Sequence, residues 1–271
     1  MSDGHSGART VRRLDIGSLV GLSLAVGVVL AGHLVEGGSV RSLWQPAAAL
    51  VVLGGTFSAV LISYPLATVR QTLHAIWHVC THDSANADGL VGTIIEYAHR
   101  ARRKGAPALE PELDHVRDPF LLGALTLAVD GTRPDAARQV LNIYRVAQHK
   151  GLELAAEVLE TAAGYTPTLG ILGAVMGLIH VMESLNEPAR LGAGIAVAFV
   201  ATIYGVAAAN LVLLPLATKL RGFVRNEDLR HEIVIEGVVA ILEGQNPRLI
   251  EQKLEGYLTP DPGAPSDRRV A

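Results

Sequence analysis

Four long stretches of this chain contain no Asp, Glu, Lys or Arg, and they constrain the fold more than any other feature. A helix needs about 20 apolar residues to cross the roughly 30 Å hydrocarbon core of a bilayer, and each stretch reaches that length. Their hydropathy therefore predicts four transmembrane helices. The four charge-free windows are residues 16–35, 42–69, 161–182 and 191–218.

Composition supports a membrane protein. Hydrophobic residues make up 49% of the chain and charged residues only 18%, whereas soluble domains carry about 25% charged residues. A net charge of −3, without a basic patch interleaved with aromatic residues, argues against a nucleic-acid partner. The single cysteine, Cys80, has no partner for an intrachain disulfide and no neighbour at metal-ligand spacing.

The first window could instead be the core of a cleaved signal peptide, because arginines precede it. It is longer than a usual signal core of about 7–15 residues, and a second window follows closely. We therefore expect it to remain as a helix of the mature protein.

Basic residues beside the windows predict the orientation. They gather before the first window, after the second and after the fourth, whereas the two short loops hold only Arg41 and Arg190. The positive-inside rule then places both termini and the long middle segment in the cytoplasm. The clustered basic residues are Arg9, Arg12, Arg13, Arg100, Arg102, Arg103, Lys104, Lys219, Arg221 and Arg225.

The expected fold is an all-α integral membrane protein with a helical cytoplasmic domain between spans two and three and a cytoplasmic C-terminal tail. In the tail, Asn246 followed by Pro247 predicts a capped helix. The expected segments are a cytoplasmic N-terminus (1–15), a transmembrane hairpin (16–66), the cytoplasmic helical domain (67–163), a second hairpin (164–218), a helical tail (219–258) and a disordered end (259–271).

Small residues recur at helical spacing in the third and fourth windows. In lipid, such residues let helix backbones approach closely, so helix packing explains most of them. The alternative is that one small-residue face lines a channel or cradles a partner helix. The residues are Gly170, Gly173, Ala174, Gly177, Gly194, Ala198, Ala201, Thr202, Gly205 and Ala209.

Two prolines lie near the cytoplasmic ends of these windows. Pro167 is expected to begin span three and Pro215 to end span four. Each removes a backbone donor, which marks either a plain helix end or a bend beside a pathway. Both interpretations stay open, as does the role of the Thr202 hydroxyl, since a membrane threonine commonly bonds to its own helix.

None of the four windows contains a carboxylate. The one histidine of span three is His180, which is expected toward the outer end and whose role stays open. A proton or cation relay through a membrane normally needs an ionisable group. If this chain belongs to an ion-driven machine, another subunit must supply the carboxylate.

The segment GYTPTLGILGAVMGLIHVMESLNEPARLGAGIAVAFVATIYGVAAANLVLLPLATKL, residues 164–220, closely resembles spans three and four of MotA-type flagellar stator subunits. LDIGSLVGLSLAVGVVLAGHL and LVVLGGTFSAVLISYP resemble the first hairpin of that family. RRKGAPALE, DPFLLGALTLAVDGT and EGVVAILEGQNPRLIEQKL resemble its cytoplasmic segments. The resemblance extends from about residue 14 to 258.

The resemblance implies a subunit of the bacterial inner membrane that forms a ring, a pentamer, around two copies of a MotB-like partner. That partner supplies a transmembrane aspartate, which agrees with the missing carboxylate. Ion flow past the aspartate would drive torque on the rotor protein FliG, so the chain would be neither an enzyme nor a cofactor protein.

Four residues acquire expected roles in the ion pathway from this resemblance. Pro167 and Pro215 occupy positions associated with coupling ion passage to conformational change. Thr202 occupies the position that faces the partner's aspartate. Ala174 occupies a position where sodium-driven members tend to carry threonine, so proton coupling is expected.

The resemblance also implies a rotor contact in the cytoplasmic segment. Arg102 and Glu110 match the family's charged pair, with Gly105 between them, and Arg103 is an alternative for the basic role. Pro107 leaves the local shape of this loop open. Without the resemblance, both charges would be interpreted as solvated surface residues.

Other classes of function remain as alternatives. A TolQ/ExbB-like energiser would resemble this chain but has three spans, and a sodium-driven stator would differ mainly in its ion. A passive scaffold of a membrane ring would tolerate changes at Pro167 and Thr202. An enzyme has little support, because no catalytic triad order, metal spacing or phosphate loop is present.

Overall fold

The computed structural model describes residues 16–81, 87–183, 186 and 188–258, and all the regular elements within these ranges are helices. The chain is thus all-helical over its described length. The expected cytoplasmic N-terminus (1–15) and disordered end (259–271) lie outside the described residues.

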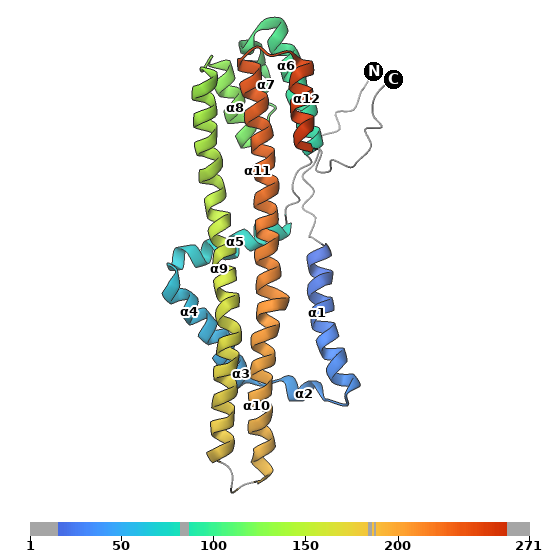
Figure 1. Ribbon diagram of the computed structural model, residues 1–271, viewed down its shortest axis with the longest axis vertical. Helices are drawn as coiled ribbons and strands as arrows, with labels where there is room; N and C mark the ends of the chain where they lie inside the picture. Colours follow the sequence, from blue (N-terminus) through green and yellow to red (C-terminus); the bar gives the residue numbers. More distant parts are fainter. Residues whose placement is uncertain (1–15, 82–86, 184–185, 187, 259–271) are drawn as a thin grey trace. The chain divides into compact units, whose positions relative to one another are not determined.

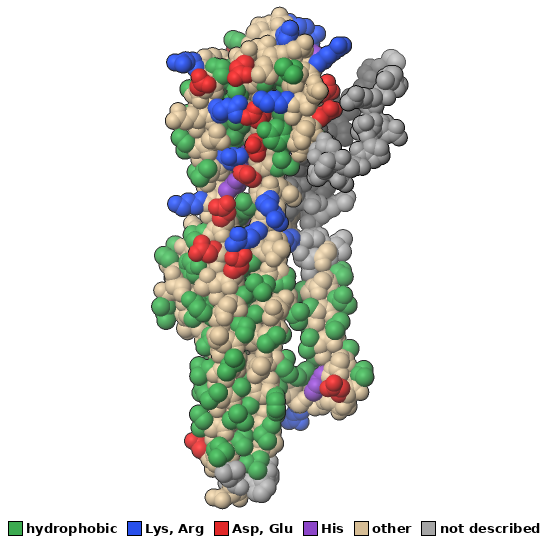
Figure 2. All heavy atoms as spheres, in the orientation of Figure 1, with side chains coloured by type: hydrophobic (Ala, Val, Ile, Leu, Met, Phe, Trp, Pro, Cys, Tyr) green, Lys and Arg blue, Asp and Glu red, His purple; other side chains and the backbone are tan. Residues whose placement is uncertain are grey.

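The chain divides into two compact units. Unit 1 comprises residues 1–83 and 151–223, and unit 2 comprises residues 84–150 and 224–271. Two long helices belong in part to each unit. Figure 2 shows charged side chains gathered over unit 2, whereas α9 and α10 in unit 1 present mainly hydrophobic side chains.

Unit 1 contains the four charge-free windows. Its chain reverses after the first helix at Gly37, whose φ of 82° lies in the left-handed region. Its elements are α1 (Ile16–Val35), α2 (Val40–Leu43), α3 (Pro46–Ala49), the π-helix η1 (Leu50–Gly54), α4 (Gly55–Ser63), α5 (Leu66–Thr81), residues 151–183 of α9 (Pro134–Glu183), α10 (Pro188–Ala207), the π-helix η3 (Ala208–Leu213) and the first ten residues of α11 (Leu214–Leu242).

Three helical segments are long and apolar enough to cross a membrane: Val40–Ser63, Pro134–Glu183 and Gly194–Leu242. The structure is therefore that of a multi-pass membrane protein. The first charge-free window also forms a helix, the 20 residues of α1, which at about 1.5 Å per residue is close to the thickness of a bilayer core.

The second charge-free window does not form one continuous span. The apolar helix ends at Ser63, and Tyr64 is extended, with φ −133° and ψ 145°. Pro65 explains this end, because proline disfavours the helical conformation of the residue before it. Residues 66–69 instead begin α5, so the window extends beyond the membrane helix that it predicts.

Both prolines of the third and fourth windows lie within helical segments rather than at their ends. Pro167 is internal to the 50-residue helix α9. Pro215 is the second residue of α11, directly after η3, and the helical path continues to Leu242. Of the two interpretations left open by the sequence, a plain helix end does not apply to either proline, so a bend or local disturbance within the helical path is the remaining one.

Unit 2 is a helical domain with a large aliphatic core. Asp118 caps α8 by accepting from the Phe120 and Leu121 amides, and Asn246 caps α12 as expected, accepting from the Arg248 amide at 3.1 Å. Its elements are α6 (Ala87–Lys104), the 3₁₀ helix η2 (Ala106–Leu109), α7 (Glu110–Leu113), α8 (Pro119–Val129), α12 (Pro247–Leu258), and residues 134–150 of α9 and 224–242 of α11.

Charged groups inside unit 2 are paired. Glu236, on α11, lies between Arg138, which donates a hydrogen bond to it, and Lys253, whose Nζ is 2.5 Å from its Oε2. The hydrogen bond from Arg138 is the main reason that the pKa of Glu236 is lowered. Nearby, His231 stacks on Phe120, with ring centroids 3.9 Å apart.

Candidate functional site: the crossing of two membrane helices

The backbones of α9 and α10 approach each other closely at several glycines. A Cβ added at Gly205 would lie 2.9 Å from the carbonyl oxygen of Thr166 and 3.2 Å from the Cα of Pro167. A Cβ added at Gly170 would lie 3.1 Å from the carbonyl oxygen of Ala201. Because these neighbours are backbone atoms, only glycine lets the two helices approach so closely.

The same contact between α9 and α10 continues toward the C-terminal end of α9 and the N-terminal end of α10. A Cβ at Gly177 would lie 2.9 Å from the Ala198 amide nitrogen, and one at Gly173 would lie 2.9 Å from the Cβ of Ala201. The glycine face of α9 is therefore filled by α10 of the same chain. Helix packing, rather than a channel lining, explains these glycines.

Two buried threonines lie beside the crossing and were not singled out from the sequence. Thr166 donates to the Ala162 carbonyl at 2.5 Å, and Thr56 donates to the Val52 carbonyl at 2.7 Å. Their hydroxyl oxygens are 3.4 Å apart, which links α4 to α9. A hydroxyl next to a proline in a membrane helix was the only signal available, and such hydroxyls usually bond within their own helix.

The structure brings some of the expected pathway residues together. Pro167 lies against Gly205, and Thr202 is adjacent, since a Cβ at Gly170 would be 3.5 Å from the Thr202 Cα. The Thr202 side chain is exposed on the surface of α10, and its hydroxyl is 3.4 Å from the Ala198 carbonyl. It is thus directed away from the interior of this chain and is free to meet another one.

The other two expected pathway residues lie farther along the helices. Ala174 is half-buried on α9, next to Gly173 of the contact with α10, and Pro215 is exposed beyond η3. His180 is exposed near the C-terminal end of α9, with Nδ1 3.9 Å from Oε2 of Glu183. None of the charge-free windows supplies a carboxylate to the crossing.

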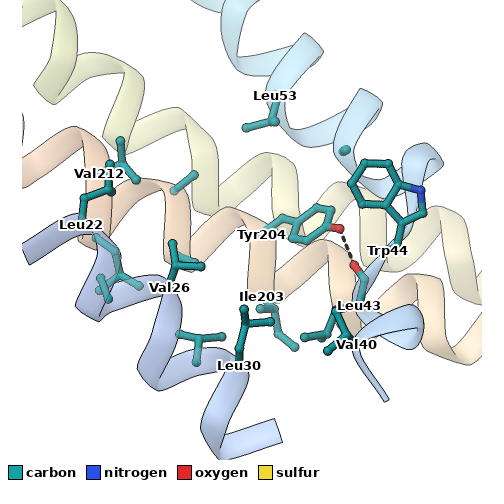
Figure 3. A pocket seen from close by; sticks show the side chains of 16 residues that line it. Leu22, Val26, Leu30, Val40, Leu43, Trp44, Leu53, Ile203, Tyr204 and Val212 are labelled. Carbon is teal, nitrogen blue, oxygen red and sulfur yellow. Dashed lines mark hydrogen bonds between the residues drawn. The ribbon is translucent and has the colours of Figure 1, made fainter. Parts of the chain in front are cut away.

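An apolar cavity of about 720 Å³ lies within unit 1 between α1, the segment from α2 to η1, and the segment from α10 to η3. Figure 3 shows Tyr204 directed across it toward Leu43, whose carbonyl accepts the phenol hydrogen bond. Every other residue that lines it is apolar. The cavity therefore offers no acidic group that could relay a proton.

The expected rotor contact lies in unit 2, where a tight turn joins α6 to η2. Gly105, with φ 83°, makes the turn, and Leu109 is fully buried at the end of η2. Pro107 occupies the 3₁₀ helix without disturbing this turn. Arg100 and Glu112 form the ion pair across it.

Arg102 and Glu110 do not pair with each other. Both side chains are exposed, and neither has an ion-pair partner within the described part of the chain. Arg103, the alternative basic residue, is also exposed. These charges are available to a partner rather than to the fold of this unit.

Comparisons with known proteins identify the class to which this arrangement belongs. Residues 112–233 match the MotA/TolQ/ExbB proton channel family, and residues 19–105 match the motility protein A N-terminal family. Motility protein A of Bacillus subtilis is 36% identical over 247 residues, covering 90% of this chain and 91% of that protein.

Solved structures agree with these matches. The flagellar MotAB stator complex from Bacillus subtilis matches with a TM-score of 0.84 and 35% identity, covering 90% of this chain and 96% of that one. The structure of C. jejuni MotAB matches with a TM-score of 0.86 and 28% identity, covering 93% and 99%.

A multi-pass helical subunit of a proton channel is the class that the fold and the family match define, so the chain is a channel component rather than an enzyme. The chain belongs to the MotA branch of the MotA/TolQ/ExbB family, the stator subunits of the flagellar motor. The match over the first hairpin favours MotA over the TolQ/ExbB alternative.

Proposed function

We propose that this chain forms a transmembrane proton path together with a MotB-like partner that supplies an aspartate, and that proton flow through this path turns the flagellar rotor. One observation carries the proposal: Thr202 is exposed beside a glycine-packed helix crossing whose membrane windows contain no carboxylate. The solved relatives are MotAB complexes, which supports a partner of this kind.

The proposed topology has four spans in the bacterial inner membrane, with both termini in the cytoplasm. Three spans lie within the long apolar segments, and the fourth is α1. The domain plan follows from it: hairpins at 16–66 and 164–218, a cytoplasmic domain at 67–163, and a tail from 219. Clustered arginines and lysines on the proposed inner side support this orientation.

Pro167 and Pro215 are proposed to couple ion passage to movement. Each interrupts backbone hydrogen bonding inside a helical segment, and Pro215 follows a π-helical stretch, a feature common at functional sites. Because Pro167 lies against Gly205, a change of bend at Pro167 would be transmitted directly to α10, which carries Thr202.

Ala174 is the basis for choosing the proton as the transported ion. Its methyl group has no oxygen with which to replace part of a sodium hydration shell, whereas a proton needs only a titratable group from the partner. A sodium-driven stator is the alternative. Motility that follows external sodium and ignores the proton gradient would favour that alternative.

The proposed assembly is a pentamer of this chain around two partner helices, with Arg102 and Glu110 contacting the rotor protein FliG. Both side chains are exposed and neither has an ion-pair partner among the residues that the structure describes, which supports the contact. Complementary charges steer association and can be re-paired as the rotor moves.

Proton flux in cells that express this chain with and without its partner tests the proposal. We expect little flux from this chain alone, flux with the partner, and loss of that flux when the partner's membrane aspartate is replaced by asparagine. Thr202→Val should impair motility at normal subunit abundance.

Thr126→Val is the matched control, because Thr126 is an exposed threonine of unit 2 whose hydroxyl bonds to its own helix at 2.8 Å. It should leave motility unchanged. A strong proton leak from this chain alone would overturn the proposal, and normal motility of the Thr202→Val and Pro167→Leu variants would indicate a passive scaffold.

A further inference from the structure

We propose that α5 is a lipid-binding element that lies in the cytoplasmic face of the membrane and prefers anionic phospholipids. The inference goes beyond the proposed function, because it concerns neither the ion nor the rotor. It requires that the neighbouring apolar helices cross the membrane, and the cytoplasmic side of α5 rests on the proposed topology.

The position of α5 relative to its neighbours in unit 1 is the first support. Figure 1 shows α5 running crosswise to α9 and α10 instead of alongside them. It begins directly after the Tyr64–Pro65 turn that ends the apolar segment Val40–Ser63. A helix perpendicular to membrane-spanning helices, at the end of one of them, lies in the plane of the membrane.

The second support for the proposal is the position along α9 and α11 at which α5 packs. Its buried residues Ala75 and Val79 pack in one cluster with Leu159 of α9 and Leu220 of α11. Charged side chains resume at this level, since Arg221 forms a two-point ion pair with Glu160 at 2.6 Å just beyond the charge-free windows. The α5 helix therefore lies at the boundary between hydrocarbon and water.

The exposed side of α5 carries large apolar residues in a row. Leu66, Leu73 and Trp77 recur at spacings of seven and four, which places them on one side of a helix with about 3.6 residues per turn. They are 63%, 64% and 61% exposed, although the opposite face of α5 is buried in unit 1. Leucine and tryptophan in such a row are typical of helices that insert into a membrane interface.

Positive charge lies beside this row. Arg70 and His74 are exposed one turn apart, next to Leu73 and Trp77 on the helix surface. The sequence contains no acidic residue between Glu36 and Asp83. Arg70 can therefore reach lipid phosphates while the leucines and Trp77 contact the acyl chains, an arrangement that favours anionic headgroups.

Tryptophan fluorescence tests the proposal in the full chain bound to its partner in nanodiscs. The chain has two tryptophans, so a Trp44→Phe background leaves Trp77 as the single reporter in this subunit. The nanodiscs contain phosphatidylcholine and phosphatidylglycerol at equal mole fraction, with either the one or the other brominated. A brominated lipid quenches a tryptophan by contact. We expect both to quench Trp77, with phosphatidylglycerol enriched about fivefold at low salt.

Arg70→Gln should remove the preference for phosphatidylglycerol and leave quenching by phosphatidylcholine in place. Arg133→Gln, an exposed arginine of unit 2, is the matched control and should keep the preference. If neither brominated lipid quenches Trp77, then water or another protein surface covers α5 and the proposal is overturned. Equal quenching by both lipids, unchanged in Arg70→Gln, would overturn the anionic preference. Neither outcome depends on proton flux, so the proposed function is tested separately.

Discussion

Units 1 and 2 pack their helices by different means. In unit 1, α9 and α10 meet through glycine and alanine, so that backbone touches backbone at Gly205 and Thr166. In unit 2, large aliphatic side chains such as Ile94, Leu125 and Leu254 are fully buried. In lipid, burial of apolar surface offers no net drive, so close backbone packing must supply the contact energy, whereas in water burial itself drives folding.

The two units also differ in the partners to which their polar side chains bond. The threonine hydroxyls at the crossing bond to their own helix backbones, as in Thr166 to Ala162 and Thr56 to Val52. In unit 2, charged side chains join separate helices, as in the contacts of Glu236 with Arg138 and Lys253. An ion pair inside a bilayer would carry a large desolvation cost, which explains why the described ion pairs between helices lie in unit 2 or, as for Arg221 and Glu160 of unit 1, just beyond the charge-free windows.

A cavity in the core of unit 2 should have the largest effect. Leu254 of α12 is fully buried, so Leu254→Ala should lower the free energy of unfolding by about 2–5 kcal/mol. Leu249→Ala, on the exposed face of the same helix, should have little effect. Thermal unfolding of the purified protein measures the difference, and equal midpoints for the two variants would contradict the assigned core.

Stability should also depend on pH through His231. Burial is the main reason that the pKa of His231 falls to about 4, and the neighbouring His149 lowers it further. The unfolded chain then binds a proton below pH ~6.5 that the folded chain does not, so stability should fall by at most about 3 kcal/mol as pH falls from 6.5 to 4.

His231→Leu should flatten this dependence, because the buried group that resists protonation is gone. His99→Leu, at an exposed histidine on α6, should leave the slope unchanged. Unfolding midpoints of the two variants, measured across this pH range, test whether His231 causes the pH dependence. An identical slope in the His231→Leu variant would show that other groups cause the dependence.

A methyl group at the helix crossing tests the packing of unit 1. Gly205→Ala places a Cβ against backbone atoms of Thr166 and Gly170, so the helices must separate, at a cost of about 1–3 kcal/mol. Gly164→Ala on α9 meets open space and is the matched control. Thermal midpoints in nanodiscs should fall for Gly205→Ala alone; unchanged stability there would mean that the backbones are not in contact.

The smallest effect is expected at the exposed charges. Arg102→Gln should change the free energy of unfolding by no more than about 0.5 kcal/mol, because Arg102 has no ion-pair partner among the described residues. Arg100→Gln removes the pair with Glu112, worth up to about 1 kcal/mol. Chemical denaturation compares the two, and a large loss at Arg102 would assign that residue to the fold instead of to a partner surface.

Much of the membrane architecture could be predicted from local patterns. Charge-free windows locate the apolar helices because the cost of placing charge in a bilayer depends on each residue alone. The Asn246 cap could also be predicted, because a cap depends only on neighbours in sequence. The resemblance of residues 164–220 led to the correct family, whereas the roles of Pro167, Ala174, Thr202 and Pro215 remain predictions.

The sequence by itself thus determined where the chain is apolar, that Asn246 caps the last helix, and that no carboxylate lies in the membrane windows. Only the tertiary structure decided that the glycines of α9 pack against α10, that Pro167 lies inside a helix, and that α5 runs crosswise to α9. The physical reason is that small residues, prolines and amphipathic rows each permit several arrangements. Which one occurs depends on the partner surface that the rest of the fold provides.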